Sequence, residues 1–177
     1  GGSRPGLLAG KRVVVTAAAG TGIGFATARR CAEEGADGVL SDAHEGRLDR
    51  ARERMPEAVD AVRCDVTDEA QVQALLGRAG DVDVFVCNAG LGAAAPLLEM
   101  DDGLWGRLID VNLTGTMRCV RAAMAHMVPR GRGAIVTNAS VLGWRAQPGQ
   151  TAYAASKAGI MALTRCAAME AAPHGVR

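Results

Sequence analysis

The sequence predicts an α/β protein in which a doubly wound parallel sheet lies between two layers of helices. Short, β-branched apolar runs alternate with longer segments that have the period of helices, which is the pattern of repeated strand–helix units. The connections between them are short, and the strands are apolar on both faces, as in buried parallel sheets. With 177 residues the chain suits one domain with a sizeable core. We therefore expect a single three-layer α/β/α domain.

Each expected strand or helix can be placed by its period and by the residues that interrupt it. The strands are the apolar runs at residues 11–16, 38–41, 61–64, 83–87 and 133–138. The helices follow at about residues 22–34, at 45–54, from 68 onward, at 101–128 and at 153–170. Glycine and proline close several of these segments, as at Gly35, Pro129 and Gly131.

The composition argues against several classes of protein. The net charge is +1 with both signs interspersed, so we expect no nucleic acid partner and no membrane surface. No apolar stretch reaches the roughly 18 residues that a transmembrane helix needs. The five cysteines are scattered among apolar neighbours and the three histidines stand far apart, which predicts buried, reduced thiols and no metal site. These features together indicate a cytoplasmic protein.

A glycine-rich turn, AAAGTGIG, directly follows the first expected strand and opens the first expected helix. Gly20, Gly22 and Gly24 would let the backbone approach a pyrophosphate, whose charge the helix N-terminus favours. A glycine-rich turn alone is often an ordinary connection, but the strand–turn–helix context favours phosphate binding.

A carboxylate, Asp42, follows the second expected strand. It stands about as far beyond Gly24 as the acidic residue that binds the adenosine ribose in dinucleotide sites. The alternative is an aspartate that makes a turn or caps the helix at 45–54.

A tyrosine and a lysine four residues apart form the candidate catalytic pair. Tyr153 and Lys157 lie in an expected helix, where residues i and i+4 share a face. A neighbouring ammonium favours phenolate over phenol, which suits Tyr153 to general acid–base chemistry. Ser140 follows the strand at 133–138 and should lie where that strand ends. The Tyr-x-x-x-Lys spacing alone would also fit an ordinary helix surface.

Asn112 lies within the expected helix at 101–128, although asparagine is a poor helix former. It is either a satisfied buried asparagine or the position of a local helix kink that serves the site. The other polar candidates fall at or just beyond the carboxyl ends of strands, where open α/β sheets bind ligands: the glycine turn, Asp42, Asn88, Ser140 and Tyr153.

In sequence order these motifs resemble the short-chain dehydrogenase/reductase family, including its 3-oxoacyl reductases and hydroxysteroid dehydrogenases. The resemblance runs from Lys11 to Arg177 and includes TAAAGTGIG at 16–24, CDVTD at 64–68, CNAG at 87–90, VNLTG at 111–115, NAS at 138–140 and YAASK at 153–157. It implies a Rossmann-type dinucleotide-binding domain that transfers hydride between a nicotinamide cofactor and a substrate carbon.

The resemblance also implies a role for each matching residue. Tyr153 would exchange a proton with the substrate oxygen, Lys157 would hold the nicotinamide ribose, and Ser140 would orient the substrate. Asn112 would support a water-linked proton relay behind Lys157. The cofactor would lie against the remaining matches: Thr16, Gly20, Gly22, Ile23 and Gly24 in the phosphate loop, Asp65 and Val66 at the adenine, and Asn88, Ala89 and Gly90 along its length.

The chain departs from the family pattern in three places. Ala17 stands where the family usually has its first glycine, and the loop is one residue longer, which predicts an altered phosphate turn. Cys87 replaces the usual asparagine, with little expected effect on the chemistry. Members usually continue well beyond the position of Arg177, with further strands, substrate-covering helices and a subunit interface. Because an unpaired edge strand favours aggregation, we expect the chain to continue and the domain at 1–177 to lack this substrate-covering part.

Asp42 also predicts the cofactor. A carboxylate can accept hydrogen bonds from ribose hydroxyls but would repel a 2′-phosphate, so we expect NAD rather than NADP. His44 and Arg47 stand close enough in the sequence to keep NADP as the alternative.

The substrate is expected to be a hydrophobic secondary alcohol or ketone, such as a steroid-derived ring or an acyl-CoA thioester. The glycine loop resembles members that act in bacterial sterol or acyl-CoA breakdown. Two alternatives remain, an NADPH-dependent reductase of 3-oxoacyl thioesters and a non-catalytic nucleotide-binding sensor. Family habit implies a homotetramer or a dimer. The residues expected to form an apolar substrate wall are Val141, Leu142, Trp144, Gln147, Pro148 and those at 91–96.

Overall fold

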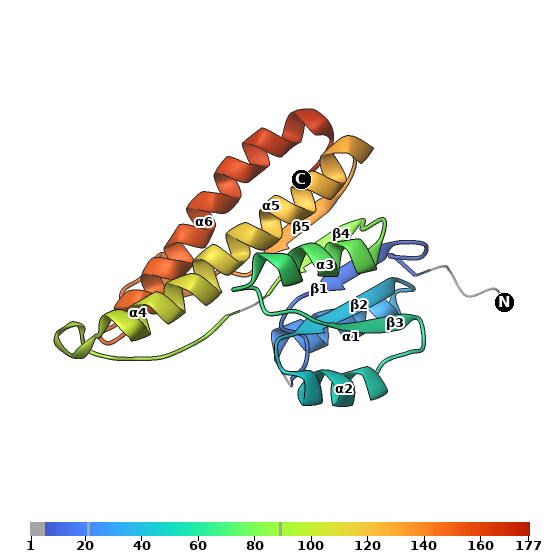
Figure 1. Cartoon of the computed structure of the whole chain (residues 1–177). Coiled ribbons are helices and arrows are strands. Elements are labelled where there is room, and N and C mark those ends of the chain that lie inside the picture. The colour runs from blue at the N-terminus through green and yellow to red at the C-terminus, as the bar shows by residue number, and fades with distance from the viewer. Residues whose placement is uncertain (1–5, 21, 89) are drawn as a thin grey trace.

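Figure 1 shows the computed structural model of the chain, which describes residues 6–20, 22–88 and 90–177. Parallel strands form one sheet in the order β3-β2-β1-β4-β5. The strands are β1 (Arg12–Val15), β2 (Asp37–Asp42), β3 (Val59–Arg63), β4 (Val84–Cys87) and β5 (Ala134–Thr137). Each begins and ends within two residues of its predicted bounds. The predicted parallel α/β sheet is therefore confirmed.

The sheet is doubly wound about its central strand, β1. Val14 of β1 pairs with Val39 of β2 on one side and with Phe85 of β4 on the other. The strand order runs from β1 through β2 to β3 in one direction and through β4 to β5 in the other. The carboxyl ends of β1 and β4 flank the point of reversal, where sheets of this kind leave a crevice for ligands.

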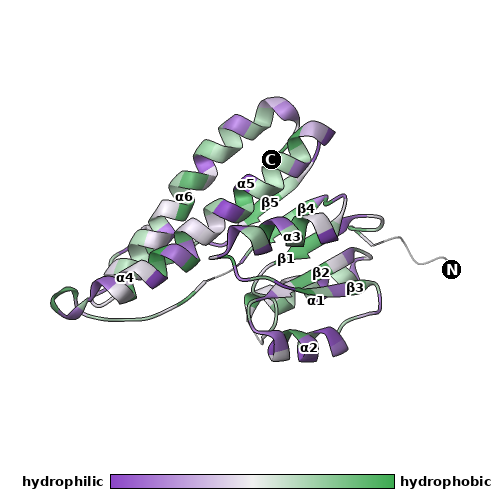
Figure 2. Cartoon of the chain, in the orientation of Figure 1, coloured by the Kyte–Doolittle hydropathy of each residue, from purple (hydrophilic) through white to green (hydrophobic). Residues whose placement is uncertain are grey.

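Helices cover both faces of the sheet, as Figure 1 shows. They are α1 (Ile23–Glu33), α2 (Glu45–Glu53), α3 (Glu69–Ala79), α4 (Asp102–Leu108), α5 (Gly115–Met127) and α6 (Thr151–Ala171). On one face, Phe25 of α1 and Leu48 of α2 pack in a core cluster with residues of β1, β2 and β3. On the other face, Leu75 of α3 and Val120 of α5 pack with Phe85. In Figure 2, β1 and β4 are among the most hydrophobic segments, whereas α2 is largely hydrophilic and lies at the surface.

The helix predicted at 101–128 is present from Asp102 to Met127, but its middle is π-helical rather than α-helical. A π-helical segment, Ile109–Thr114, separates α4 from α5. A π turn holds one residue more than an α turn and often marks a functional position. Asn112 lies inside this segment and is fully buried. The irregularity that the sequence suggested at Asn112 is therefore present.

Most of the cysteines are buried, as predicted. Cys64, Cys87 and Cys119 are buried and Cys31 is half-buried, but Cys166 is exposed on α6, where the prediction is wrong. Burial raises the pKa of the Cys64 thiol to about 12, so it remains protonated and is no nucleophile. Within the described ranges, no helix is long and apolar enough to cross a membrane, and no cluster of three or more His, Cys, Asp or Glu side chains could bind a metal ion.

Candidate active site

The candidate phosphate loop connects β1 to α1. Thr16 is buried at the end of β1, and its hydroxyl accepts a hydrogen bond of 2.9 Å from the backbone N–H of Asn88. This bond joins the carboxyl ends of β1 and β4. Ala17, which replaces the usual glycine, has a φ of 51°, in the left-handed region that costs an L-residue about 1–2 kcal/mol. The backbone here has a glycine-like conformation without a glycine.

Gly24 is the loop glycine that packing requires. A Cβ at this position would lie 2.4 Å from the Ala17 carbonyl oxygen and 2.5 Å from Asn88 Nδ2. A Cβ on Gly22 would meet nothing within 4 Å, so space is open there. Gly22 and Ile23 line the cleft described below, and the first turn of α1 contains no acidic residue. The positive end of the α1 dipole is thus available to an anion.

Asp42, at the end of β2, links two backbone segments. One carboxylate oxygen accepts a hydrogen bond from the N–H of Ala19 in the glycine loop (3.2 Å), and the other accepts one from the N–H of His44 (2.9 Å). Asp42 therefore makes the turn that the sequence left as an alternative. The helix cap is a different residue, because His44 Nδ1 accepts from the N–H of Arg47 (3.1 Å). Each carboxylate oxygen has a second lone pair with which it could accept a ribose hydroxyl.

Asp65 and Val66 follow β3 in a tight turn. Asp65 Oδ1 accepts hydrogen bonds from both the N–H (2.9 Å) and the hydroxyl (2.8 Å) of Thr67. Val66 is buried, and its carbonyl accepts a hydrogen bond from Arg118 of α5. These contacts hold the turn at the carboxyl end of β3, beside the end of β2 where Asp42 lies.

Lys157 is a buried cation beside Tyr153. Its side chain is 5% exposed, and its ammonium donates a hydrogen bond of 3.1 Å to the backbone carbonyl of Asn138. The Lys157 Nζ lies 5.6 Å from the centre of the Tyr153 ring. Burial lowers the pKa of Lys157, because the ammonium loses solvation. Both residues line one cleft, as their spacing predicts.

Asn112 clamps the loop after β4 to α6. Its Oδ1 accepts from the N–H of Leu91 (2.6 Å), and its Nδ2 donates to the Leu91 carbonyl (2.9 Å) and to Ser156 Oγ (3.2 Å). The Ser156 hydroxyl then donates to the backbone carbonyl of Tyr153 (2.7 Å). Among the described residues no hydrogen bond joins Asn112 to Lys157 directly, so the relay role stays a prediction that needs a bridging water.

Ser140 lies at the rim of the cleft. It precedes a short 3₁₀ turn, Val141–Gly143, and its Oγ accepts a hydrogen bond of 3.1 Å from the N–H of Leu142. Its neighbours Ala139 and Leu142 line the cleft. With its oxygen engaged in this way, the hydroxyl can donate its hydrogen to a ligand.

The cleft has a volume of about 690 Å³ and lies at the carboxyl edge of the sheet. Of the predicted site residues, those that line it are Gly22, Ile23, Asn88, Gly90, Tyr153 and Lys157. Those that border or support it are Thr16, Gly24, Asn112 and Ser140, and Gly20 lies in the glycine loop near Gly22. Asp42 ends β2, and Asp65 and Val66 follow β3, as expected for the adenosine end of a cofactor. Ala89 lies outside the described residues.

The predicted apolar wall is only partly present. Leu91, Ala93, Ala94 and Leu142 line the cleft, and the N–H of Ala95 donates to the carbonyl of Gly149 (2.9 Å), which joins the two loops that carry the wall. The remaining predicted wall residues after Ser140 do not line it: Val141, Trp144, Gln147 and Pro148. Val141 and Trp144 are 61% and 78% exposed, respectively.

Two residues of the site were missed by sequence reasoning. Ser156 is buried between Asn112 and Tyr153, and Asn138 supplies the carbonyl that binds Lys157. The Asn138 amide also donates to Asn88 Oδ1, which links the ends of β5 and β4. Both residues stand inside the YAASK and NAS motifs, so their position beside predicted residues was an available signal.

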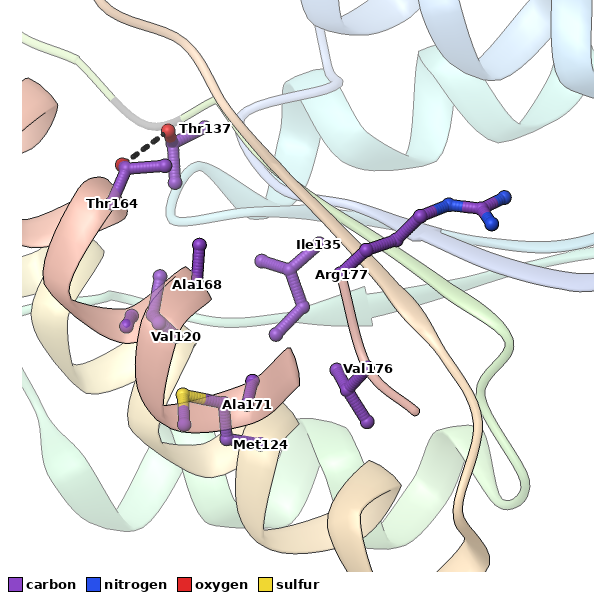
Figure 3. Close-up of a pocket in the computed structure, with 10 residues that line it drawn as sticks. Val120, Met124, Ile135, Thr137, Thr164, Ala168, Ala171, Val176 and Arg177 are labelled. Carbon is purple, nitrogen blue, oxygen red and sulfur yellow. Dashed lines mark hydrogen bonds between the residues drawn. The ribbon is translucent and has the colours of Figure 1, made fainter. Parts of the chain in front are cut away.

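A second hollow, of about 40 Å³, lies between β5, α5 and α6 and is apolar (Figure 3). Alkyl side chains such as Val120, Ile135 and Ala171 line it, and its two threonines, Thr137 and Thr164, hydrogen-bond each other at 2.7 Å. The Arg177 guanidinium points away from it in Figure 3. This lining has no group suited to acid–base or nucleophilic chemistry, so the cleft at the strand ends is the candidate active site.

Comparison with known proteins agrees with this arrangement. The family model described as short chain dehydrogenase matches residues 11–177. The chain belongs to the short-chain dehydrogenase family. It is accordingly an oxidoreductase that acts on CH–OH groups with a nicotinamide cofactor and a small-molecule substrate.

Several members of the short-chain dehydrogenase family are closely similar. A (5R,7aS)-5-hydroxy-7a-methyl-1-oxo-2,3,5,6,7,7a-hexahydro-1H-indene-carboxyl-CoA reductase of Mycobacterium tuberculosis is 56% identical, over 97% of this chain and 69% of its own. The cis-4-hydroxycyclohexanecarboxylate dehydrogenase of Sinomonas cyclohexanicum is 45% identical, over 94% of this chain and 70% of the length of that dehydrogenase. The crystal structure of a short chain dehydrogenase from Mycobacterium smegmatis superposes with a TM-score of 0.93 at 53% identity, covering 97% of this chain and 75% of that one.

Proposed function

We propose that the protein is an NAD-linked enzyme that interconverts a hydrophobic secondary alcohol and its ketone. The Tyr153–Lys157 pair is the observation that carries this proposal. A buried ammonium lies beside a phenol, and both line the cleft at the carboxyl edge of the sheet. Such a phenol is suited to give and retake a proton, which is the step that alcohol–ketone interconversion requires besides hydride transfer.

The residues present fit a nicotinamide dinucleotide. The close packing of Gly24 on Ala17 and Asn88 leaves the open loop before α1 for the pyrophosphate. Asp42 would hold the adenosine ribose and the Asp65–Val66 turn the adenine. Thr16, Asn88, Ala89 and Gly90 belong to the segments along which the rest of the cofactor would lie. The nicotinamide supplies the hydride acceptor or donor.

In the proposed reaction, each side chain of the site has a distinct task. The Ser140 hydroxyl donates a hydrogen bond to the substrate oxygen and orients it. Tyr153 gives that oxygen a proton during reduction and takes one from it during oxidation. Lys157 stabilises the phenolate form and binds the ribose hydroxyls next to the nicotinamide. Asn112 and Ser156 hold α6 against the loop after β4, and the amide supports proton relay through water behind Lys157.

Asp42 favours NAD, because its carboxylate would repel a 2′-phosphate. One observation favours the alternative, an NADPH-dependent reductase of 3-oxoacyl thioesters. Arg63 pairs with Asp42 in the sheet, and its Nε donates to the Ala43 carbonyl at 3.1 Å, which brings a guanidinium near the ribose site. Fluorescence titration with NADH and with NADPH decides between them. Tighter binding of NADH is expected, and tighter binding of NADPH would overturn the NAD assignment.

The substrate we propose is an alicyclic alcohol or ketone whose ring also carries a carboxyl group, free or as its CoA thioester. The names of the Mycobacterium tuberculosis and Sinomonas cyclohexanicum relatives both describe such a ring. The apolar side chains of Leu91, Ala93 and Leu142 along the cleft support a carbocyclic ring rather than a sugar. Members of the family are usually dimers or tetramers, so we expect one of these oligomeric states here. Size-exclusion chromatography with light scattering would test this.

The decisive experiment measures NADH formation with a panel of cyclic alcohols, for the parent protein and for Tyr153→Phe. We expect turnover to fall by roughly 10²-fold or more in the variant, since general acid–base catalysis contributes about 10²–10⁴-fold. Binding of NADH should persist, because the change removes only one oxygen. A variant with unchanged turnover would refute the proposal, and a parent protein that binds NADH but oxidises no alcohol would support the nucleotide-sensor alternative.

A further inference from the structure

An arginine of α5 ties the turn after β3 to the π-helical segment. Arg118 Nη1 donates a hydrogen bond of 3.0 Å to the carbonyl of Val66 and one of 2.9 Å to Asp110 Oδ1. Its side chain is only 18% exposed. Because Asp110 accepts from the same nitrogen that binds Val66, the carboxylate fixes the direction of the guanidinium, and both bonds are charge-assisted.

The turn at Asp65 and Val66 is pressed closely against α5. A Cβ on Gly115 would lie 2.6 Å from Val66 Cγ2, so only glycine permits this approach of helix and turn. On its other side, the N–H of Asp65 donates to Gln71 Oε1 of α3 at 2.9 Å. The turn is therefore held on one side by the hydrogen bond to α3 and on the other by Arg118 and Gly115 of α5.

We propose that Arg118 is a positioning residue for the adenine end of the cofactor. The inference rests on the proposed function, in which Asp65 and Val66 flank the adenine. The guanidinium holds the Val66 carbonyl and so fixes the turn against which the adenine would lie. Arg118 itself does not touch the reacting atoms, so its effect falls on affinity for the adenosine half rather than on the chemical step.

The same helix offers a matched control. Arg121 lies one turn further along α5 and also pairs with a carboxylate, Glu69 of α3, at 3.1 Å. Its side chain is 60% exposed, and its partner Glu69 lies in α3 rather than in the turn at 65–66. Arg118→Met and Arg121→Met each remove one guanidinium and one ion pair from α5, but only Arg118→Met removes the bond to Val66.

The test is a calorimetric titration of both variants with NADH, with ADP-ribose and with reduced nicotinamide mononucleotide. Arg118→Met should bind NADH and ADP-ribose about tenfold more weakly, a fold-change typical of losing one hydrogen bond to a charged group. Its affinity for the mononucleotide should not change. The KM for cofactor should rise while kcat at saturating cofactor stays within about twofold. Arg121→Met should match the parent protein, and Arg118→Lys, which keeps a donor near Val66, should recover part of the affinity.

Several outcomes would overturn the inference. Unchanged affinity of Arg118→Met for ADP-ribose would show that the turn does not need the guanidinium. A fall in kcat with no change in cofactor KM would assign Arg118 to the chemistry through Asp110 and Asn112 instead. If Arg118→Met does not fold, Arg118→Lys and Asp110→Asn replace it, and full ADP-ribose affinity in both overturns the inference. Failure of the parent protein to bind any dinucleotide would refute the proposed function itself, which distinguishes the two.

Discussion

The packing around Gly24 gives a quantitative prediction for Gly24→Ala. The new Cβ would lie 2.4 Å from the Ala17 carbonyl oxygen and 2.5 Å from Asn88 Nδ2. Optimal separations of non-bonded atoms are about 3.5–4.0 Å, so the loop or the strand end must move by roughly 1 Å. Overpacking of this kind costs about 1–3 kcal/mol. The helix propensity of alanine over glycine offsets up to about 1 kcal/mol of that cost.

Gly77→Ala is the matched control, because it isolates helix propensity from overpacking. Gly77 is an exposed residue of α3, and a Cβ there would meet nothing within 4 Å. We expect this variant to be more stable than the parent by about 0.5–1 kcal/mol. The difference in the free energy of unfolding between the two variants then measures the overpacking alone, and should be about 1–3 kcal/mol.

Urea unfolding and thermal melting measure the stability difference, and NADH titration measures the site. For a chain of this size each kcal/mol shifts Tm by about 2–4 °C. Because the clash would displace Ala17 and Asn88 together, NADH should also bind about tenfold more weakly to Gly24→Ala. If Gly24→Ala has the same Tm as Gly77→Ala and binds NADH as tightly as the parent, α1 does not approach the end of β4 as closely as the structure shows.

Two further changes test the interior of the site. Burial lowers the pKa of Lys157 below its ordinary value of 10.5, so the folded state binds fewer protons than the unfolded state at pH values between these two pKa values. The contribution of Lys157 to stability should therefore rise with pH across that window. In urea unfolding, the stability of the parent relative to Lys157→Met should increase from neutral pH toward 10.5. A difference in stability that does not change with pH would contradict this. Ser156→Ala leaves one N–H of Asn112 without its buried acceptor and should cost about 1–3 kcal/mol of stability in urea unfolding. An unchanged unfolding midpoint would mean that the Asn112–Ser156 hydrogen bond contributes nothing to stability.

The strands and most helix ends could be predicted because local chemistry determines them. The run at Val13–Val15 is apolar and β-branched, and a glycine-rich turn follows it closely. The spacing of Tyr153 and Lys157 predicted a shared helix face, and the place of Tyr153 just beyond a strand end favoured the ligand-binding edge of the sheet, where both residues line the cleft. The π-helical segment could not be predicted from periodicity, because one extra residue per turn changes no composition. The bond from the Ala19 N–H to Asp42 depends on how β1 and β2 align, which no local pattern contains, whereas the bond from the His44 N–H is the local turn that the sequence offered as an alternative.

The substrate wall shows a different limit of sequence reasoning. Val141 and Trp144 are apolar residues next to Ser140, but the 3₁₀ turn at Val141–Gly143 directs only Leu142 into the cleft. A turn of three residues has no reliable signature in a single sequence, since side chains one position apart point in different directions. Proximity to Ser140 along the chain therefore predicted more cleft-lining side chains than the structure contains.

The π-helical segment at Ile109–Thr114 also constrains how this chain can change. In a regular α-helix each residue advances the side-chain direction by about 100°, so one additional residue rotates everything that follows by that angle. Without the additional residue, α4 and α5 would form one regular α-helix with a single helical phase. Either Asn112 would then turn away from Leu91, or the core face of α5 would turn away from the sheet. Substitutions can alter the amide but not this phase. The placement of Asn112 is thus set by the number of residues in the chain, and deletion of one residue between 109 and 114 would be harmful even where every remaining side chain is kept.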